Sequence, residues 1–231
     1  MKNNAFLAIL LVFVGLFFIT ISKGYTKDNY NKENEYEFDA NLIHQKEQFS
    51  KSCENAIVQI CTIIEGDRVF GSGFFIDGNK IATNYHVIKN AKEIFVLLKD
   101  DEMAYKAYVN SVDKENDIAV LVVANKIPTN VKSLELSTNF FQDEIVYAGG
   151  FDLEYNIKLS KIIEEEFEYD GKTYIKIDKP VNRGNSGGPV LNNEGHVIGM
   201  VMFGNAKTTS LIPSEKIIRL VEREKKLLYN N

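Results

Sequence analysis

From Ala56 onward, the apolar residues of this chain occur in short runs that are separated by polar turns. Such runs span residues 56–64, 74–76, 94–98 and 118–123. Runs of this length, bounded by glycine and charged residues, are typical of β-strands, because an amphipathic helix needs a longer stretch with a 3.6-residue period. The pattern therefore predicts an all-β domain.

Two segments have helical spacing instead. The first predicts a short amphipathic helix ahead of the first strand, from the apolar positions Leu42, Ile43, Phe49 and Cys53. The second follows Pro213-Ser214, where apolar and charged residues follow a helical period. It predicts a closing helix at about 214–229.

The first 22 residues form a separate segment, in which Lys2 precedes an uncharged, mostly apolar run from Asn3 to Ser22. The run is slightly long for the core of a signal peptide and slightly short for a spanning helix. We favour a cleaved signal peptide over an uncleaved membrane anchor for residues 1–22. Either one predicts an exported, extracytoplasmic domain, periplasmic or secreted, and an anchor would add membrane contact through this segment.

Residues 23–38 are polar and lack apolar periodicity, which predicts a flexible linker. Residues 39–231 would then form one domain. Within it we expect a first barrel at about 55–125, a connection near Ile127-Pro128, a second barrel at about 134–205 and a hairpin turn at Asp170-Gly171.

Composition narrows the possible partners. The chain has 231 residues, 45% of them apolar, which is enough for a sizeable core. A formal net charge of −5, without a Lys/Arg-rich stripe, argues against binding to nucleic acid.

Cys53 and Cys61 would be too far apart along an extended strand for a disulfide, whose Cα atoms lie within roughly 7 Å, so two free thiols are favoured over a bridge. Nothing resembles a zinc site, and we expect no metal and no cofactor.

Ser186 is the strongest candidate for chemistry, because it lies in the glycine-rich turn Arg-Gly-Asn-Ser-Gly-Gly. A serine hydroxyl is a poor nucleophile at neutral pH, so it requires a base and a third group that orients the base. His86 follows an apolar run and fits the base, and Asp117 directly precedes the run 118–123 and fits the orienting carboxylate. The other two histidines, His44 and His196, are interpreted as structural or surface residues.

The order His, Asp, Ser belongs to the chymotrypsin-like arrangement of this triad. Four stretches resemble the trypsin-like peptidase superfamily, and most closely its HtrA/Deg-type branch. They are a glycine-rich hairpin at 71–76, a histidine motif at 83–87, an aspartate motif at 116–121 and a serine motif at 182–189. The resemblance implies two chymotrypsin-like six-stranded β-barrels with a C-terminal α-helix, and a triad in the cleft between the barrels.

The same resemblance implies a serine endopeptidase that cleaves exported or misfolded polypeptides, as in protein quality control. The amides of Gly184 and Ser186 would form the oxyanion hole, in which one donor typically contributes about 2.7 to 4 kcal/mol. Asn185 stands where digestive relatives have an aspartate that pairs with a new N-terminus, so we expect no activation by cleavage of that kind.

Specificity is indicated by the strand 199–204, which by resemblance supplies the wall of the primary pocket through Met202, Phe203 and Gly204. Pro180 stands where trypsin has an acid at the pocket floor, which argues against a preference for Lys or Arg. We expect small or aliphatic residues before the scissile bond, with broad cleavage because apolar pockets discriminate weakly.

One departure from the family pattern and two alternative functions remain. The HtrA/Deg family usually carries a PDZ domain after the closing helix, whereas this sequence has no residues left for one, which puts regulation by substrate C-termini in question. The family's homotrimer is implied by resemblance only. The alternatives are a catalytically weak, peptide-binding or chaperone-like relative, and a glutamyl-endopeptidase-like enzyme, although residues 199–204 lack the histidine which that specificity normally uses.

Overall fold

The computed structural model describes residues 40–229 of the chain. The leader predicted for residues 1–22 and the linker predicted for residues 23–38 lie outside the described residues. Among the described residues, no helix has the length and apolar content needed to cross a membrane.

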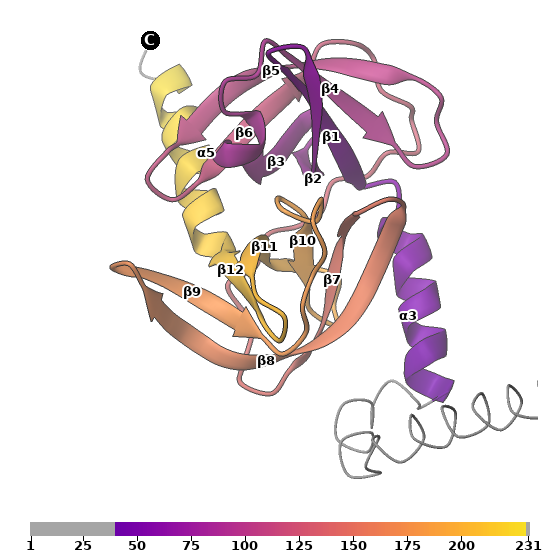
Figure 1. Ribbon diagram of the computed structural model, residues 1–231, viewed down its shortest axis with the longest axis vertical. Helices are drawn as coiled ribbons and strands as arrows, with labels where there is room; N and C mark the ends of the chain where they lie inside the picture. The colour runs from indigo at the N-terminus through magenta and orange to yellow at the C-terminus, as the bar shows by residue number, and fades with distance from the viewer. Residues whose placement is uncertain (1–39, 230–231) are drawn as a thin grey trace, which may run out of the picture. The chain divides into compact units, whose positions relative to one another are not determined.

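Twelve strands form two closed antiparallel barrels of six strands each, as predicted (Figure 1). The first barrel has the strand order β1-β2-β3-β6-β5-β4. Its strands are β1 (Ile57–Ile64), β2 (Asp67–Asp77), β3 (Lys80–Asn84), β4 (Glu93–Leu98), β5 (Ala104–Asp113) and β6 (Ile118–Val123). A one-turn helix, α4 (Tyr85–Ile88), follows β3.

The second barrel has the order β10-β11-β12-β9-β8-β7. Its strands are β7 (Ile145–Phe151), β8 (Tyr155–Tyr169), β9 (Lys172–Ile177), β10 (Pro189–Leu191), β11 (Val197–Gly204) and β12 (Thr209–Pro213). The turn between β8 and β9 is the two-residue hairpin Asp170-Gly171, whose φ values of 51° and 69° are those that a tight hairpin turn requires.

The second barrel continues past residue 205, the limit expected from the sequence, because β12 completes it. The Asn205 side chain accepts the backbone N–H groups of Lys207 and Thr208, and so forms the turn that reverses the chain. β12 has only five residues and leads directly into the closing helix. Only Leu211 and Ile212 of its five residues are aliphatic, so the sequence pattern marks this strand weakly.

Each barrel encloses its own hydrophobic core, because every second side chain along a strand points to the inside of the barrel. The first core includes Val58, Phe75, Ile81, Val96 and Leu121, and the second includes Val146, Ile162, Ile175, Ile198 and Leu211. Cys53 and Cys61 are buried, free thiols.

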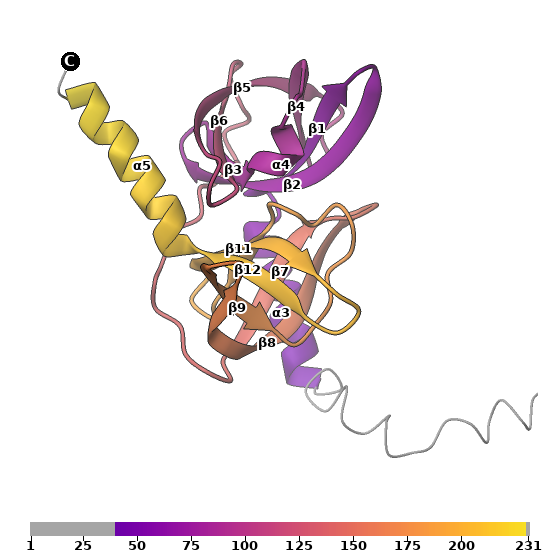
Figure 2. The same ribbon diagram turned by 60° about the vertical axis from the view of Figure 1, so that its left-hand side comes forward.

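Two longer helices flank the strands. α3 (Ala40–Cys53) precedes β1, and its Phe49 stacks on Tyr147 of β7 with ring centroids 4.1 Å apart. α5 (Ser214–Tyr229) leaves β12 and extends to the side of the first barrel (Figure 1), whereas Figure 2 shows it pointing outward from β12. There the carboxylate of Glu224 lies 3.2 Å from Lys80 Nζ and accepts the hydroxyl of Ser111. α5 thus connects the end of the second barrel to the first.

Candidate active site

His86 and Asp117 meet at the edge of the first barrel. β3 ends at Asn84 and α4 begins at once, so His86 lies in its first turn, while Asp117 directly precedes β6, the strand that pairs with β3. Asp117 Oδ2 lies 2.6 Å from His86 Nδ1, and Asp117 Oδ1 accepts the backbone N–H of His86 at 2.8 Å. The carboxylate therefore fixes both the ring and the backbone of the histidine.

The backbone of Asp117 is unusual, with a φ of 57° in the left-handed region. Aspartate tolerates this region better than most residues do. The conformation is held by its own carbonyl, which accepts the backbone N–H of Tyr85 at 3.1 Å and the side-chain amide of Asn84 at 3.2 Å. The Asp113 side chain further fixes the loop through two hydrogen bonds from Asn116.

Ser186 lies in the turn before β10 of the second barrel, and this turn packs against the segment that leads to His86. A Cβ built at Gly187 would lie 2.2 Å from the carbonyl oxygen of Ser72 and 3.1 Å from Asn84 N, so only glycine fits there. Gly187 also has a φ of 87°, which favours glycine. The serine turn and the histidine segment are thus in direct contact.

The hydroxyl of Ser186 is directed at the backbone carbonyl of Met202, at 3.5 Å. Within the described residues, the hydrogen bonds of His86 and Ser186 do not include one to each other. His86 remains accessible, because 47% of its side chain is exposed, compared with 13% for Asp117. The structure thus joins His86 to Asp117 directly, and Ser186 to them through the packing of its turn.

Ser72, in the glycine-rich stretch of β2, is a site residue that the sequence did not single out. It is fully buried, and its backbone N–H donates to the carbonyl of Ser186 at 2.8 Å. Its hydroxyl donates to the carbonyl of Gly184 at 2.7 Å and accepts the backbone N–H of Phe151 at 2.9 Å. One residue of the first barrel therefore holds two carbonyls of the serine turn, one through its side chain and one through its backbone.

Because the carbonyls of Gly184 and Ser186 point toward Ser72, the N–H groups of this turn can point away from Ser72. The N–H groups of Gly184 and Ser186, the pair predicted for the oxyanion hole, donate to no acceptor within residues 40–229. Gly184 has a φ of 100°, and a Cβ there would lie 2.5 Å from the carbonyl oxygen of Phe151. Asn185 between them is 1% exposed, and a neutral amide avoids the cost of burying a charge at this depth.

The three residues predicted for the substrate pocket lie in a row at the end of β11. Phe203 and Gly204 pair with Ser210 and Thr209 of β12, and Met202 provides the carbonyl next to the Ser186 hydroxyl. The Thr209 hydroxyl donates to the carbonyl of Lys179 and accepts the N–H of Val181, and so fixes the segment that contains Pro180.

Tyr174 of β9 brings the second barrel close to Asp117. Its side chain is 4% exposed and makes an edge contact with Phe203, at a centroid separation of 5.4 Å. Burial, and then the negative charge of Asp117, raise the pKa of Tyr174. Next to it, Lys172 Nζ donates to the backbone carbonyl of Glu115, across the barrels. This face of the second barrel is therefore directed at the Asp117 loop.

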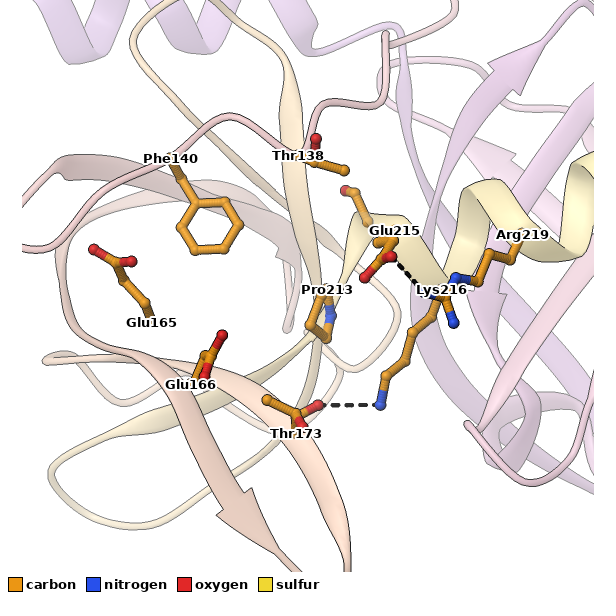
Figure 3. A pocket seen from close by; sticks show the side chains of 10 residues that line it. Thr138, Phe140, Glu165, Glu166, Thr173, Pro213, Glu215, Lys216 and Arg219 are labelled. Carbon is orange, nitrogen blue, oxygen red and sulfur yellow. Dashed lines mark hydrogen bonds and ion pairs between the residues drawn. The ribbon is translucent and has the colours of Figure 1, made fainter.

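A hollow of about 550 Å³ lies elsewhere, beside the start of α5 (Figure 3). Three of its charged groups have partners, because Arg219 Nη2 lies 2.5 Å from Glu215 Oε1 and Lys216 Nζ donates to the carbonyl of Thr173 at 3.1 Å. Burial lowers the pKa of Lys216. Among residues 40–229, no three His, Cys, Asp or Glu side chains are grouped so that they could hold a metal ion.

The structure has two six-stranded barrels, with a histidine and an aspartate on one and a serine in a glycine-rich turn on the other. This arrangement defines the class of chymotrypsin-like serine peptidase folds. A family model described as a trypsin-like peptidase domain matches residues 71–200. The chain belongs to this family, and within it to the HtrA/Deg type.

Several curated proteins are similar to the chain. Serine protease HTRA3 of Mus musculus is 32% identical over 168 residues, covering 65% of this chain and 36% of the relative. Serine protease HTRA1B of Danio rerio is 29% identical over 213 residues, covering 84% of this chain and 43% of the relative. The chain spans about a third of the length of the first relatives that it matches, with covered shares of 36%, 28% and 33%.

Solved structures share the fold. The serine endoprotease from Yersinia pestis has a TM-score of 0.67 and 23% identity, and the match covers 78% of this chain and 66% of that one. A protease from M. tuberculosis in its active form has a TM-score of 0.69 and 22% identity, with coverage of 80% of this chain and 86% of that one. These structures support the two-barrel architecture.

Proposed function

We propose that this protein is a serine endopeptidase in which Ser186 is the nucleophile, His86 the general base and Asp117 the group that orients His86. The observation that carries the proposal is the pair of contacts that Asp117 makes with His86, at 2.8 Å to the backbone N and 2.6 Å to ring Nδ1. The glycine-rich turn with Ser186 lies beside them. This is the geometry expected of a carboxylate that fixes the tautomer of a catalytic imidazole.

In the proposed reaction, the Ser186 hydroxyl turns from the Met202 carbonyl toward His86 Nε2 and attacks the scissile carbonyl as Nε2 takes its proton. Catalytic hydrogen bonds are often long before substrate binds and tighten in the complex. The protonated imidazole, stabilised by Asp117, then gives its proton to the leaving amine. Water hydrolyses the acyl-enzyme in a second step with the same proton transfers.

The oxyanion that forms on the scissile carbonyl would be bound by the N–H groups of Gly184 and Ser186. Support comes from the Ser72 contacts, which hold the carbonyls of the same two residues at 2.7 Å and 2.8 Å. Donors that are fixed before the reaction stabilise the transition state without a reorganisation cost.

For specificity, we propose small or aliphatic residues before the scissile bond, in a pocket walled by Met202, Phe203 and Gly204. A glutamyl-specific enzyme would need a cation or histidine there, and residues 199–204 contain neither. For location and assembly, we propose export, with exported or misfolded polypeptides as substrates in protein quality control, and a homotrimer as in the resembling family.

The decisive experiment is labelling of the purified protein with a fluorophosphonate probe, compared with the Ser186→Ala variant. We expect labelling of the wild type only, together with hydrolysis of an unfolded protein such as casein. Sequencing of the products would show small or aliphatic residues before the cuts. A wild type that binds peptides but neither labels nor cleaves would establish the binding-only alternative, and cuts after acidic residues would establish the glutamyl alternative.

A further inference from the structure

The outer face of the first barrel carries an apolar hollow of about 390 Å³. It lies over β2, β1, β4 and β5, which follow one another around the barrel (Figure 1). Its apolar lining residues are Ile63, Phe70, Phe95, Leu97 and Ala104, and Cys61 and Arg68 complete the lining. We call it the outer hollow. Its size and its mostly apolar lining with one charged group are typical of small-molecule sites, which range from about 300 to 1,000 Å³.

Strand register places Cys61 at the centre of the outer hollow. Cys61 is directly opposite Phe70 on one side and Phe95 on the other, and directly opposed residues share a face of the sheet. The thiol is only 7% exposed, whereas Phe70 is 45% exposed. Cys61 therefore forms the floor of the outer hollow, between two aromatic side chains.

Arg68 supplies a cation at the rim. It is directly opposite Ile63, so both residues lie on the same face as Cys61, and it is exposed. Burial raises the pKa of Cys61, and the positive charge of Arg68 opposes this rise, as expected of a guanidinium close to the thiol. Among residues 40–229, the guanidinium of Arg68 forms no ion pair or hydrogen bond. It is therefore available to an anionic group of a ligand.

The neighbouring cation is not available in this way. Lys106 is directly opposite Phe95, on the same face, and its Nζ lies 3.0 Å from Glu93 Oε1. A ligand with one negative charge therefore has a preferred end of the outer hollow, the end at Arg68.

The closed barrel argues against a peptide as the occupant. β1 pairs with β2 on one edge and with β4 on the other, and β4 pairs with β5. The strands beneath the outer hollow have no free edge, so a peptide cannot add to them as a further strand. A peptide there would bury its own amides without partners, which is unfavourable. A hydrocarbon chain has no such groups.

The charges of the adjoining turns argue against a membrane surface. The β1–β2 turn carries Glu65 and Asp67, and the β4–β5 turn carries Asp100 and Glu102, all of them exposed. A bilayer with anionic lipids would meet these carboxylates together, which is unfavourable. A single ligand molecule needs to meet only Arg68.

We propose that the outer hollow binds a free fatty acid, with its hydrocarbon chain against Phe70, Phe95 and Leu97 and its carboxylate paired with Arg68. The chain would be held by burial of methylene groups, and the charged head would fix its direction. The site shares no residue with the proposed catalytic group and does not rest on the proposed function.

The test is calorimetric titration of the full chain with hexanoate, octanoate and decanoate, and with 1-octanol, all below the concentrations at which they form micelles. We expect each added methylene to lower Kd about two- to fourfold, as burial of a CH₂ group typically does. Arg68→Gln should raise the Kd of octanoate about two- to fivefold, the usual range for an exposed ion pair, and leave that of 1-octanol unchanged. Lys126→Gln is the matched control, because it removes an exposed cation outside the outer hollow, and it should change neither Kd.

Ala104→Phe tests the cavity itself. Ala104 is an exposed lining residue of β5, so the added ring fills the outer hollow from its rim. The variant should bind neither octanoate nor 1-octanol. Val109→Phe is its control, because Val109 is 48% exposed on the same strand and lies outside the lining, and it should bind as the wild type does. Should Ala104→Phe fail to fold in thermal melts, the contrast between octanoate and 1-octanol in Arg68→Gln still decides.

Three results would overturn the proposal. The first is a wild type that binds none of the carboxylates, and the second is octanoate binding that neither Arg68→Gln nor a folded Ala104→Phe changes. The third is a different occupant. A wild-type dimer in sedimentation velocity that Ala104→Phe dissociates would assign the outer hollow to a second copy of the chain. Binding to phosphatidylglycerol vesicles that Ala104→Phe loses, without binding of octanoate, would assign it to a membrane surface.

Discussion

Asp117 binds His86 twice, with Oδ1 on the backbone N–H at 2.8 Å and Oδ2 on ring Nδ1 at 2.6 Å. The side chain of a residue held at a φ of 57° therefore sets both the position of the histidine and the direction of its ring. If the ring nitrogen that faces Asp117 carries the proton, Nε2 is left as the acceptor for a serine proton.

Asp117→Asn should leave the fold intact and reduce kcat by about 10⁴-fold, because an amide at this position stabilises the wrong imidazole tautomer. Asparagine tolerates a positive φ, so the backbone is not expected to change. Asp100→Asn is the matched control, since Asp100 has a φ of 59° and an 82% exposed side chain. Steady-state kinetics and thermal melts on both variants decide. Equal turnover in the two variants would remove Asp117 from the mechanism.

Gly184→Ala should impair turnover more than folding. The added Cβ would lie 2.5 Å from the carbonyl oxygen of Phe151, which forces the turn away from its present path and misdirects the proposed oxyanion donors. Loss of one such donor costs about 10²- to 10³-fold in kcat. Gly171→Ala introduces a side chain at a similarly positive φ of 69°, with nothing within 4 Å, and serves as control. Equal losses of stability and activity in Gly184→Ala would contradict this prediction.

Ser72→Ala tests the contact between the first barrel and the serine turn. The carbonyl of Gly184 and the N–H of Phe151 would each lose a buried partner, at about 1 to 3 kcal/mol per group. We expect the rate of fluorophosphonate labelling to fall much more than the unfolded fraction of the variant would explain. Thr83→Val is the control, because it removes a hydrogen bond to the carbonyl of Ser72 and leaves the Ser72 hydroxyl in place. It should lower stability while labelling stays near the wild-type rate.

Stability should decline in alkaline solution through Cys53. Burial raises the pKa of this thiol from an ordinary 9.0 to about 11, so the stabilisation is complete below pH 9 and is lost as the pH rises through about 11. A shift of this size corresponds to about 2 to 3 kcal/mol. Burial also raises the pKa of Tyr155 from its ordinary 10.0, so this group adds to the decline above about pH 10.

Urea unfolding at a series of pH values measures this effect. Cys53→Ala leaves a small cavity and lowers stability at neutral pH, yet it should flatten the decline between pH 9 and about pH 11. If wild type and variant lose stability in parallel over that interval, ionisation of Cys53 is not the cause.

Glu224→Gln should loosen α5 from the first barrel. Glu224 pairs with Lys80 at 3.2 Å, and the two side chains are only 11% and 20% exposed. Loss of a hydrogen-bonded charge in such surroundings costs about 1.5 kcal/mol. Glu222→Gln, on the exposed side of the same helix, should have almost no effect. Chemical denaturation of both variants gives the comparison, and equal midpoints would show that the Lys80 contact adds nothing.

The strands, the closing helix and the His86–Asp117 pairing were predictable, because each is marked by local periodicity or by a short motif. The role of Ser72 was not, since its partner Gly184 is 112 positions away and the contact depends on how two barrels meet. The contact of Tyr169 with Phe203 was missed for the same reason, because four strands must first pair in register. β12 was missed because the mostly polar run 205–210 separates Leu211 and Ile212 from β11, and two aliphatic residues are too few to mark a strand.

Two separate contacts hold the two barrels together. One is the hydrogen bond from Ser72 to Ser186, and the other is the ion pair of Glu224 in α5 with Lys80. Separating the two barrels to admit a wide substrate would break both contacts and displace Ser186. On the proposed function, a substrate is therefore expected to reach Ser186 as a narrow, extended segment. The expected substrates are then proteins in which local unfolding exposes such a segment.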